Sequence, residues 1–226
     1  MDLRLGTKAA AADVTAENPD VVVIATGGRP NKGDFDGSEL AISTWDVLSK
    51  QAISGEKVLV YDDHGQHQGS CAAQLLASHR ALVELVTPDR MIGEEAGPMN
   101  FPTHLRELFK LNVVMTPCYR LRTVYREGNK LVAVLKNEYC DLEEERVVDQ
   151  IVAEHGTLPQ DDIYFALKPL SQNLGELDLQ AIVDGQPQTV VNNRDGTFQL
   201  FRVGDAIASR NIHAAIYDSL RLCKNF

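Results

Sequence analysis

The chain is poor in cysteine, in positive charge and in long apolar runs, and each shortage excludes a class of protein. Its four cysteines, Cys71, Cys118, Cys140 and Cys223, are scattered over 226 residues and form no CxxC pair. That spacing fits neither a disulfide framework nor a zinc knuckle, so we expect a reduced, cytoplasmic protein. No apolar run approaches the roughly 18 residues of a membrane span, and Met1 leads into no apolar segment typical of a signal peptide.

Positive charge is scarce, because 22 Lys and Arg residues face 32 Asp and Glu residues and leave a formal net charge of −10. Nucleic acid requires a basic protein face that displaces counterions, and an anionic membrane surface requires the same. We therefore expect neither as a partner. The remaining composition, 44% apolar and 24% charged, is that of an ordinary globular protein.

Short β-branched runs alternate with helical patterns along the chain. Residues 21–27, VVVIATG, form a continuous run typical of a strand buried on both faces. Residues 57–61, 70–77 and 81–86 predict a strand, an alanine-rich helix and a second strand, which together make one βαβ unit. The sequence thus predicts an α/β fold class, a Rossmann-like FAD/NAD(P)-binding fold with a parallel sheet.

The other expected elements are shorter. Glu127-Gly128-Asn129 separates two extended runs and predicts a hairpin. The acidic stretch 141–145 predicts a solvated surface turn, and Asp161-Asp162 is expected to cap a short helix. The remaining predictions are helices at 43–48, 103–110 and 211–224, and strands at 112–115, 120–126, 130–136, 146–153 and 198–203.

The turn after Tyr61 resembles a dinucleotide-binding turn only in part. The GxGxxG fingerprint needs three glycines, so that the backbone can approach a pyrophosphate and the helix can pack on the strand. Here Gly65 and Gly69 are available, and Asp62-Asp63 would repel the pyrophosphate. NAD(P) is therefore not the expected cofactor, and the alternative is a structural turn.

No catalytic or metal-binding residue is predicted. The chain contains no GxSxG, Walker A or nucleophile–base pattern. Of His64, His67, His213 and Cys223, only His64 and His67 are grouped, in one loop, and for that pair too we expect polar surface or structural side chains.

The dipeptide Gly204-Asp205, directly after a predicted strand, is a candidate binding motif. Its carboxylate could accept a hydrogen bond from a ribityl or ribose hydroxyl, and the amides that open the next helix could face a phosphate. A turn followed by a helix cap is the structural alternative.

Several segments carry a family resemblance. Residues 21–30, VVVIATGGRP, resemble the ATG-x-x-P segment of flavoproteins with two dinucleotide-binding domains, and residues 201–206, FRVGDA, resemble their late GD motif. Residues 58–65, VLVYDDHG, and 204–222, GDAIASRNIHAAIYDSLRL, look like the C-terminal region of the trimethylamine dehydrogenase and 2,4-dienoyl-CoA reductase family. These proteins are long relatives of old yellow enzyme, and the resemblance covers nearly the whole chain.

The resemblance implies a domain arrangement. In that family an N-terminal TIM barrel carries FMN and a [4Fe-4S] cluster, and an FAD- or ADP-binding domain with an inserted NAD(P)-like domain follows it. Residues 1–50 would be the first segment of the FAD/ADP-binding-like domain, 55–136 the inserted domain, and 137–226 the returning segment. The barrel is absent from this sequence, as is the first GxGxxG unit of the FAD/ADP domain, so FMN and the cluster would belong to the missing barrel.

The resemblance also implies cofactor-binding residues and partners. FAD or ADP would be bound in the complete assembly by Thr26, Gly27, Gly28, Gly204, Asp205, Arg210, Asn211, Ile212 and His213. The degraded turn places the chain nearer the dehydrogenase branch, whose members oxidise amines and pass electrons to an electron-transfer flavoprotein. A barrel-bearing subunit or N-terminal region is the implied partner, and we expect an oligomer.

Three functional hypotheses follow. The first is an oxidoreductase component, part of an N-methyl amine dehydrogenase-like flavoenzyme with no autonomous activity. The second is a structural or assembly module that binds no nucleotide. An incomplete sheet exposes an edge or an apolar face, and such surfaces bind other chains. The third and weaker one is an NAD(P)H-dependent flavin reductase, which an intact GxGxxG would have supported.

Overall fold

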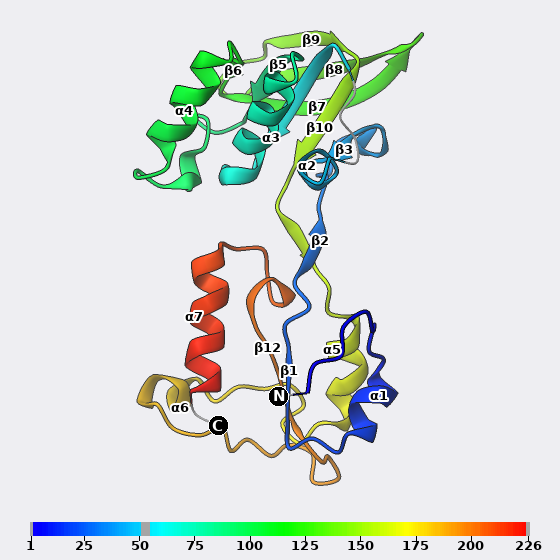
Figure 1. Cartoon of the computed structure of the whole chain (residues 1–226), viewed down its shortest axis with the longest axis vertical. Coiled ribbons are helices and arrows are strands. Elements are labelled where there is room, and N and C mark those ends of the chain that lie inside the picture. Colours follow the sequence, from blue (N-terminus) through cyan, green and yellow to red (C-terminus); the bar gives the residue numbers. More distant parts are fainter. Residues whose placement is uncertain (1, 51–54, 225–226) are drawn as a thin grey trace. The chain divides into compact units, whose positions relative to one another are not determined.

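A computed structural model describes residues 2–50 and 55–224 (Figure 1). Its contacts divide the chain into two compact units, one made of residues 30–156 and the other of the segments on either side. Met1, which begins the predicted segment 1–50, and residues 225–226, which end the segment 137–226, lie outside the described residues. Each unit is described by itself below.

The unit of residues 30–156 is built on a five-stranded parallel sheet with strand order β3-β10-β4-β5-β6. The helix α3 connects β4 to β5, which confirms the predicted βαβ unit and the α/β fold class. The strands are β3 (Ile42–Ser43), β4 (Lys57–Asp62), β5 (Leu82–Val86), β6 (Val114–Thr116) and β10 (Gln150–Glu154). The helices are α2 (Thr44–Leu48), α3 (His67–Ser78) and α4 (Phe101–Lys110), with short 3₁₀ turns at Ser38–Leu40 and Glu94–Ala96.

Strand β4 divides the core of this unit into two layers. Val58 and Val60 pack with buried residues of α2, α3 and α4. Leu59 and Tyr61 point to the opposite face and pack against a second, antiparallel sheet. Because successive side chains of a strand alternate between its faces, a continuous apolar run here serves two cores at once.

The second sheet of this unit is antiparallel and has the order β7-β8-β9. Strands β7 (Tyr119–Glu127) and β8 (Lys130–Asn137) form the predicted hairpin, and Gly128 at its tip has a φ of 59°. The acidic stretch predicted as a surface turn is wrong in part, because residues from Glu143 belong to strand β9 (Glu143–Val148). Asp141, Glu143 and Glu145 still face solvent, whereas Glu144 is half-buried.

The predicted single strand at 146–153 is two strands in different sheets. The chain leaves β9 at Val148 and enters β10 at Gln150. Between them Asp149 accepts hydrogen bonds from the backbone amides of Glu56 and Lys57, at 3.1 and 2.9 Å. Asp149 therefore anchors the point where the chain passes from one sheet to the other, and holds it against the start of β4.

The other unit contains residues 2–29 and 157–224. Its strands β1 (Val21–Ile24) and β12 (Gln199–Arg202) pair in parallel, and β2 (Gly28–Pro30) pairs with β11 (Thr157–Pro159). Strand β1 is not buried on both faces as predicted: Val22 and Ile24 are buried but the alternate valines are half-buried. Its helices are α1 (Ala11–Ala16), α5 (Asp162–Leu167), α6 (Leu179–Asp184) and α7 (Ile212–Cys223), with 3₁₀ turns at Lys168–Leu170 and Gly204–Ala206.

Side chains cap the starts of α2 and α7, whereas the cap predicted at Asp161 is wrong. Ser43 accepts the amide of Asp46 at 3.2 Å at the start of α2, and Asn211 caps α7. Asp161 does not cap α5 with its side chain. Its carboxylate instead accepts a hydrogen bond from Arg202 at 2.7 Å, and the Arg202 guanidinium lies 4.5 Å from the centre of the Tyr164 ring.

The compact unit 30–156 extends beyond the predicted inserted segment 55–136 at both ends. On one side β3 and on the other side β10 belong to the same five-stranded sheet as β4. The assignment of 1–50, 55–136 and 137–226 to cofactor-binding domains of the family stays a prediction. Within the two described ranges, no helix combines the length and the hydropathy needed to cross a membrane.

Candidate functional site

The carboxyl ends of β1 and β12 meet at one edge of their sheet. In the parallel register Ile24 is opposite Arg202, so the two strands end at the same level of the sheet (Figure 1). Ligands of open α/β folds bind at the carboxyl edge of parallel strands. Five of the predicted residues follow these two strand ends: Thr26, Gly27, Gly28, Gly204 and Asp205.

Thr157 links the segment that follows β1 to the segment that follows β12. Its hydroxyl donates a hydrogen bond to Asp205 Oδ2 at 3.2 Å, and a Cβ placed on Gly28 would lie 2.7 Å from Thr157 Cβ. Only glycine permits so close an approach. The sequence prediction missed Thr157, although Gly156-Thr157-Leu158-Pro159 repeats the glycine-to-proline spacing of the Gly27-to-Pro30 segment.

Backbone donors at the start of α7 lie close to this edge. The amide of Arg210 is 3.4 Å from Asp205 Oδ1, and the Asn211 side chain accepts the amide of Ala214 at 2.9 Å. The amides of Ile212 and His213 open the helix and have no intrahelical acceptor. Such amides, at the positive end of the helix dipole, favour a phosphate.

The Arg210 side chain has a partner of its own. Its guanidinium forms an ion pair with Asp218, one turn and a half into α7. Asp218 also accepts the amide of Gly204 at 3.3 Å. Gly204 has a φ of 61°, and a Cβ placed on it would lie 3.1 Å from Ala215 Cβ. The pair therefore holds the Gly204 turn against α7, and the glycine is needed for both its φ and its packing.

Thr26 lies apart from the Asp205 contacts. Its hydroxyl donates to the carbonyl of Gln160, and the Gln160 amide donates to the carbonyl of Gly27 at 3.0 Å. Thr26 and Gln160 also line an open cavity of about 1020 Å³, formed mostly by the backbone and small side chains of residues 6–11 and α5. Thr157 thus contacts Gly28 and Asp205, and Asp205 in turn contacts Arg210, whereas Thr26 lines a separate cavity.

At the turn after β4, the Asp62 side chain fills the space beside the backbone amides. Asp62 is 2% exposed, and its Oδ1 accepts the amides of His64 and Gly65 at 3.1 and 2.9 Å. Burial is the main reason why the pKa of Asp62 rises to about 7. A pyrophosphate at this turn would compete with that carboxylate for the same amides.

The histidines considered as metal ligands have other neighbours. His64 Nδ1 lies 3.4 Å from Glu154, and His67 Nδ1 lies 2.9 Å from the Nε2 of His104. His213 is exposed on α7. Over residues 2–50 and 55–224, no group of three or more His, Cys, Asp or Glu side chains is arranged to hold a metal ion.

Comparison with known proteins identifies long relatives. No protein-family model matches the chain. It is 49% identical over 97% of its length to the "Probable N-methylproline demethylase" of Rhizobium meliloti. It is also 46% identical over its whole length to the N,N-dimethylglycine/sarcosine dehydrogenase of Chromohalobacter salexigens. A multifunctional alkene reductase/demethylase OYE of Caballeronia cordobensis is 34% identical over 99% of the chain. The chain spans about a third of these relatives, 32%, 34% and 33% of their lengths.

Solved structures share the fold at low sequence identity. A 2-naphthoyl-CoA reductase complex superposes on the whole chain with a TM-score of 0.76 at 20% identity, over 30% of its own length. Histamine dehydrogenase from Rhizobium sp. 4-9 gives a TM-score of 0.74 at 19% identity, over 95% of this chain and 32% of its own. Thioredoxin reductase of T. acidophilum gives 0.59 at 18% identity, over 89% and 62%. These likenesses confirm the FAD/NAD(P)-binding type of fold.

Proposed function

This chain belongs, over the region that it matches, to the trimethylamine dehydrogenase and 2,4-dienoyl-CoA reductase family, and on that premise we propose that it is the nucleotide-binding-fold portion of an N-methyl amine dehydrogenase. Its relatives support this narrower assignment, because two of them are named for N-methylproline and for N,N-dimethylglycine and sarcosine. Each of those compounds is an N-methylated amino acid. The proposed substrate of the whole enzyme is therefore an N-methylated amine.

Within that enzyme, this portion binds the ADP moiety of a nucleotide, either FAD or ADP itself. The observation that carries the proposal is the contact of Thr157 with Asp205, which joins the two predicted segments at the carboxyl edge of β1 and β12. The donor set fits the ligand, since an Asp205 carboxylate suits sugar hydroxyls and the amides of Ile212 and His213 suit a phosphate.

The redox chemistry is assigned to other parts of the enzyme. FMN and a [4Fe-4S] cluster, when bound in a barrel domain, supply the electron acceptor for amine oxidation. Electron-transfer flavoprotein is the proposed receiver of the electrons, and the barrel-bearing portion is the proposed structural partner. The residues of this chain contribute binding and docking rather than acid, base or nucleophile, so we expect no amine oxidation by the chain alone.

The experiment is a titration of the isotopically labelled chain with ADP, followed by NMR and by calorimetry. We expect ADP to shift the amide signals of Thr157, Asp205 and Ile212. Asp205→Asn should weaken ADP binding about tenfold, a loss typical of one charge-assisted hydrogen bond. Asp195→Asn is the matched control, because Asp195 is exposed on a loop. Absence of any shift at about 5 mM ADP, a concentration that detects millimolar affinity, would contradict nucleotide binding.

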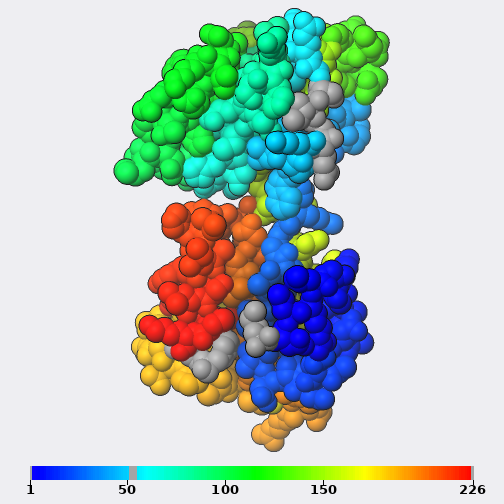
Figure 2. Space-filling model, viewed as in Figure 1, coloured from blue at the N-terminus to red at the C-terminus, as the bar shows by residue number. Residues whose placement is uncertain are grey.

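The second candidate, an assembly module without nucleotide, is favoured by the surface of α7. Ile212, Ile216 and Leu220 recur every four residues, which places them on one face of the helix, and they are 71%, 61% and 59% exposed. Figure 2 shows α7 in red on the surface of its unit. Ile216→Lys should abolish concentration-dependent association in light scattering if the module docks through this face, and should leave ADP titration unchanged.

The third hypothesis, an NAD(P)H-dependent flavin reductase, gains no support from the turn that would bind the dinucleotide. The Asp62 carboxylate already accepts two amides of that turn. Titration with NADPH under the conditions used for ADP tests this alternative directly. A specific NADPH-induced shift of the Gly65 amide would revive it.

A further inference from the structure

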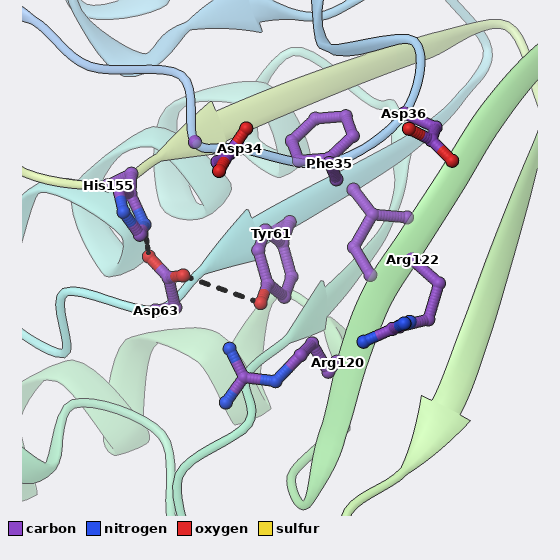
Figure 3. A pocket seen from close by; sticks show the side chains of 10 residues that line it. Asp34, Phe35, Asp36, Tyr61, Asp63, Arg120, Arg122 and His155 are labelled. Atoms are coloured by element: carbon purple, nitrogen blue, oxygen red, sulfur yellow. Dashed lines mark hydrogen bonds and ion pairs between the residues drawn. The ribbon is translucent and has the colours of Figure 1, made fainter.

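A polar cavity of about 260 Å³ lies within the unit of residues 30–156, and none of the predicted site residues lines it (Figure 3). Four separate segments form its walls: the loop at 33–36, the end of β4, the strand β7 and the end of β10. The walls include the buried side chains of Phe35, Tyr61 and Leu121, which are 8%, 3% and 2% exposed. At this size it is smaller than the roughly 300–1,000 Å³ of pockets for drug-sized ligands.

Some charges at this cavity are already compensated. The Asp63 side chain is 9% exposed and forms an ion pair with His155 Nδ1, and the Tyr61 hydroxyl donates to Asp63 Oδ2 at 3.5 Å. Arg120 Nε donates to Glu138 at 2.7 Å. Burial, and then the Asp63 charge, raise the pKa of Tyr61 far above its usual value. The phenol therefore keeps its proton and remains the donor to Asp63.

Three other charged residues of the cavity have no such compensation among the described residues. Asp34 and Asp36 lie on the loop and Arg122 lies on β7. No described residue of opposite charge comes within ion-pair distance of any of these three. Figure 3 shows Tyr61 between the loop that carries Asp34 and the strand that carries Arg120. The cavity thus offers guanidinium groups on its strand wall and carboxylates on its loop wall.

We propose that this cavity binds a small zwitterion, a free amino acid or N-methylated amino acid. Its carboxylate is held by Arg122, with the guanidinium group of Arg120 as a further donor, because planar guanidinium groups match carboxylates. Its ammonium group is attracted by the carboxylates of the loop wall, Asp34 and Asp36. A free anion lacks the group that the two carboxylates require, and a plain amine lacks the group that Arg122 requires.

This site goes beyond the proposed nucleotide function and does not depend on it. All of its residues belong to the unit 30–156, whereas every predicted cofactor-binding residue lies in the other unit. The zwitterion would therefore contact residues other than those proposed to bind the nucleotide. Failure of one proposal leaves the other intact, because ADP and the zwitterion are titrated separately.

The test is a calorimetric titration with sarcosine, beside acetate and methylamine as its two halves. We expect sarcosine to bind at least about tenfold more tightly than either half, since only the zwitterion meets both walls. Equal binding of acetate or inorganic phosphate would show a plain anion site and overturn the proposal. Absence of sarcosine binding at about 20 mM, which detects affinities in the millimolar range, would overturn it as well.

Matched variants locate the binding. Arg122→Gln and Asp34→Asn should each weaken sarcosine binding about tenfold, as expected when one charged partner is lost. Both side chains are exposed, so folding should be kept, which thermal unfolding checks. Arg126→Gln on the same strand and Asp141→Asn, both exposed outside the cavity, are the controls. Equal weakening by the controls, or none by the Arg122 variant, would contradict the site.

Discussion

The carboxylate of Asp62 accepts the backbone amide of Gly65 at 2.9 Å in the turn between β4 and α3. On its other side it lies against the helix, where a Cβ placed on Gly69 would collide with Asp62 Oδ2. In dinucleotide-binding folds a turn at this position brings its backbone to a pyrophosphate. Here a side chain of the protein itself takes up the amides of the turn.

Asp62→Asn should change how stability depends on pH. The folded-state pKa of Asp62 is about 7, raised mainly by burial, whereas an unfolded chain has about 3.9. An acid with a raised folded-state pKa stabilises the fold fully below the unfolded value and loses that contribution as pH rises through about 7. Chemical unfolding of both proteins from pH 5 to 8 is the measurement. Wild type should lose stability relative to Asp62→Asn across that range, and parallel curves would show that Asp62 titrates normally.

Gly69→Ala should destabilise the unit 30–156. The added methyl group would collide with the buried Asp62 carboxylate, and overpacking of this kind costs about 1–3 kcal/mol. In the background of Asp62→Ala the collision disappears, so the same substitution should cost much less. A double-mutant cycle of unfolding free energies measures the coupling. Equal costs in both backgrounds would place the strain elsewhere.

The fold was predictable because its signals are local. The runs at 57–61 and 81–86, with the alanine-rich segment between them, identify a βαβ unit without any knowledge of partners. The prediction failed at 146–153, where only Asp149 and Gln150 interrupt the apolar run that follows Arg146. That aspartate accepts amides at the start of β4, a long-range contact that no sequence window contains.

The two candidate sites also differ in how local their sequence signals are. Gly204-Asp205 is a contiguous motif after a strand, so the sequence drew attention to it. The cavity at Tyr61 draws its walls from four segments that lie apart in the sequence, and no single motif spans them. The ion pair of Asp63 with His155 joins residues 92 positions apart, and spacing along the chain gives no sign of such a pair.

Arg146→Gln should loosen the contact between the two sheets of the unit 30–156. Arg146 Nε lies 2.9 and 3.1 Å from the two carboxylate oxygens of Glu84 on β5, and a second nitrogen lies 2.8 Å from Glu144. The Arg146 and Glu84 side chains are 28% and 18% exposed, so the lost hydrogen bonds to charged groups should cost about 1–3 kcal/mol. Denaturant unfolding measures the loss. Arg126→Gln, on an exposed site, serves as the control and should stay within about 0.5 kcal/mol of wild type.

Asp63→Asn should lower the pKa of His155. The hydrogen bond to Asp63, ahead of the opposing effect of burial, raises the pKa of His155 above its usual 6.5. A histidine with a raised folded-state pKa stabilises the protein below about 6.5 and loses that contribution as pH rises through the folded value. The variant should therefore lose more stability at pH 6 than at pH 9. Proton NMR follows the His155 ring through the titration, with Asp141→Asn as the control that leaves it unchanged. An identical His155 titration in Asp63→Asn would mean that the ion pair does not hold the proton.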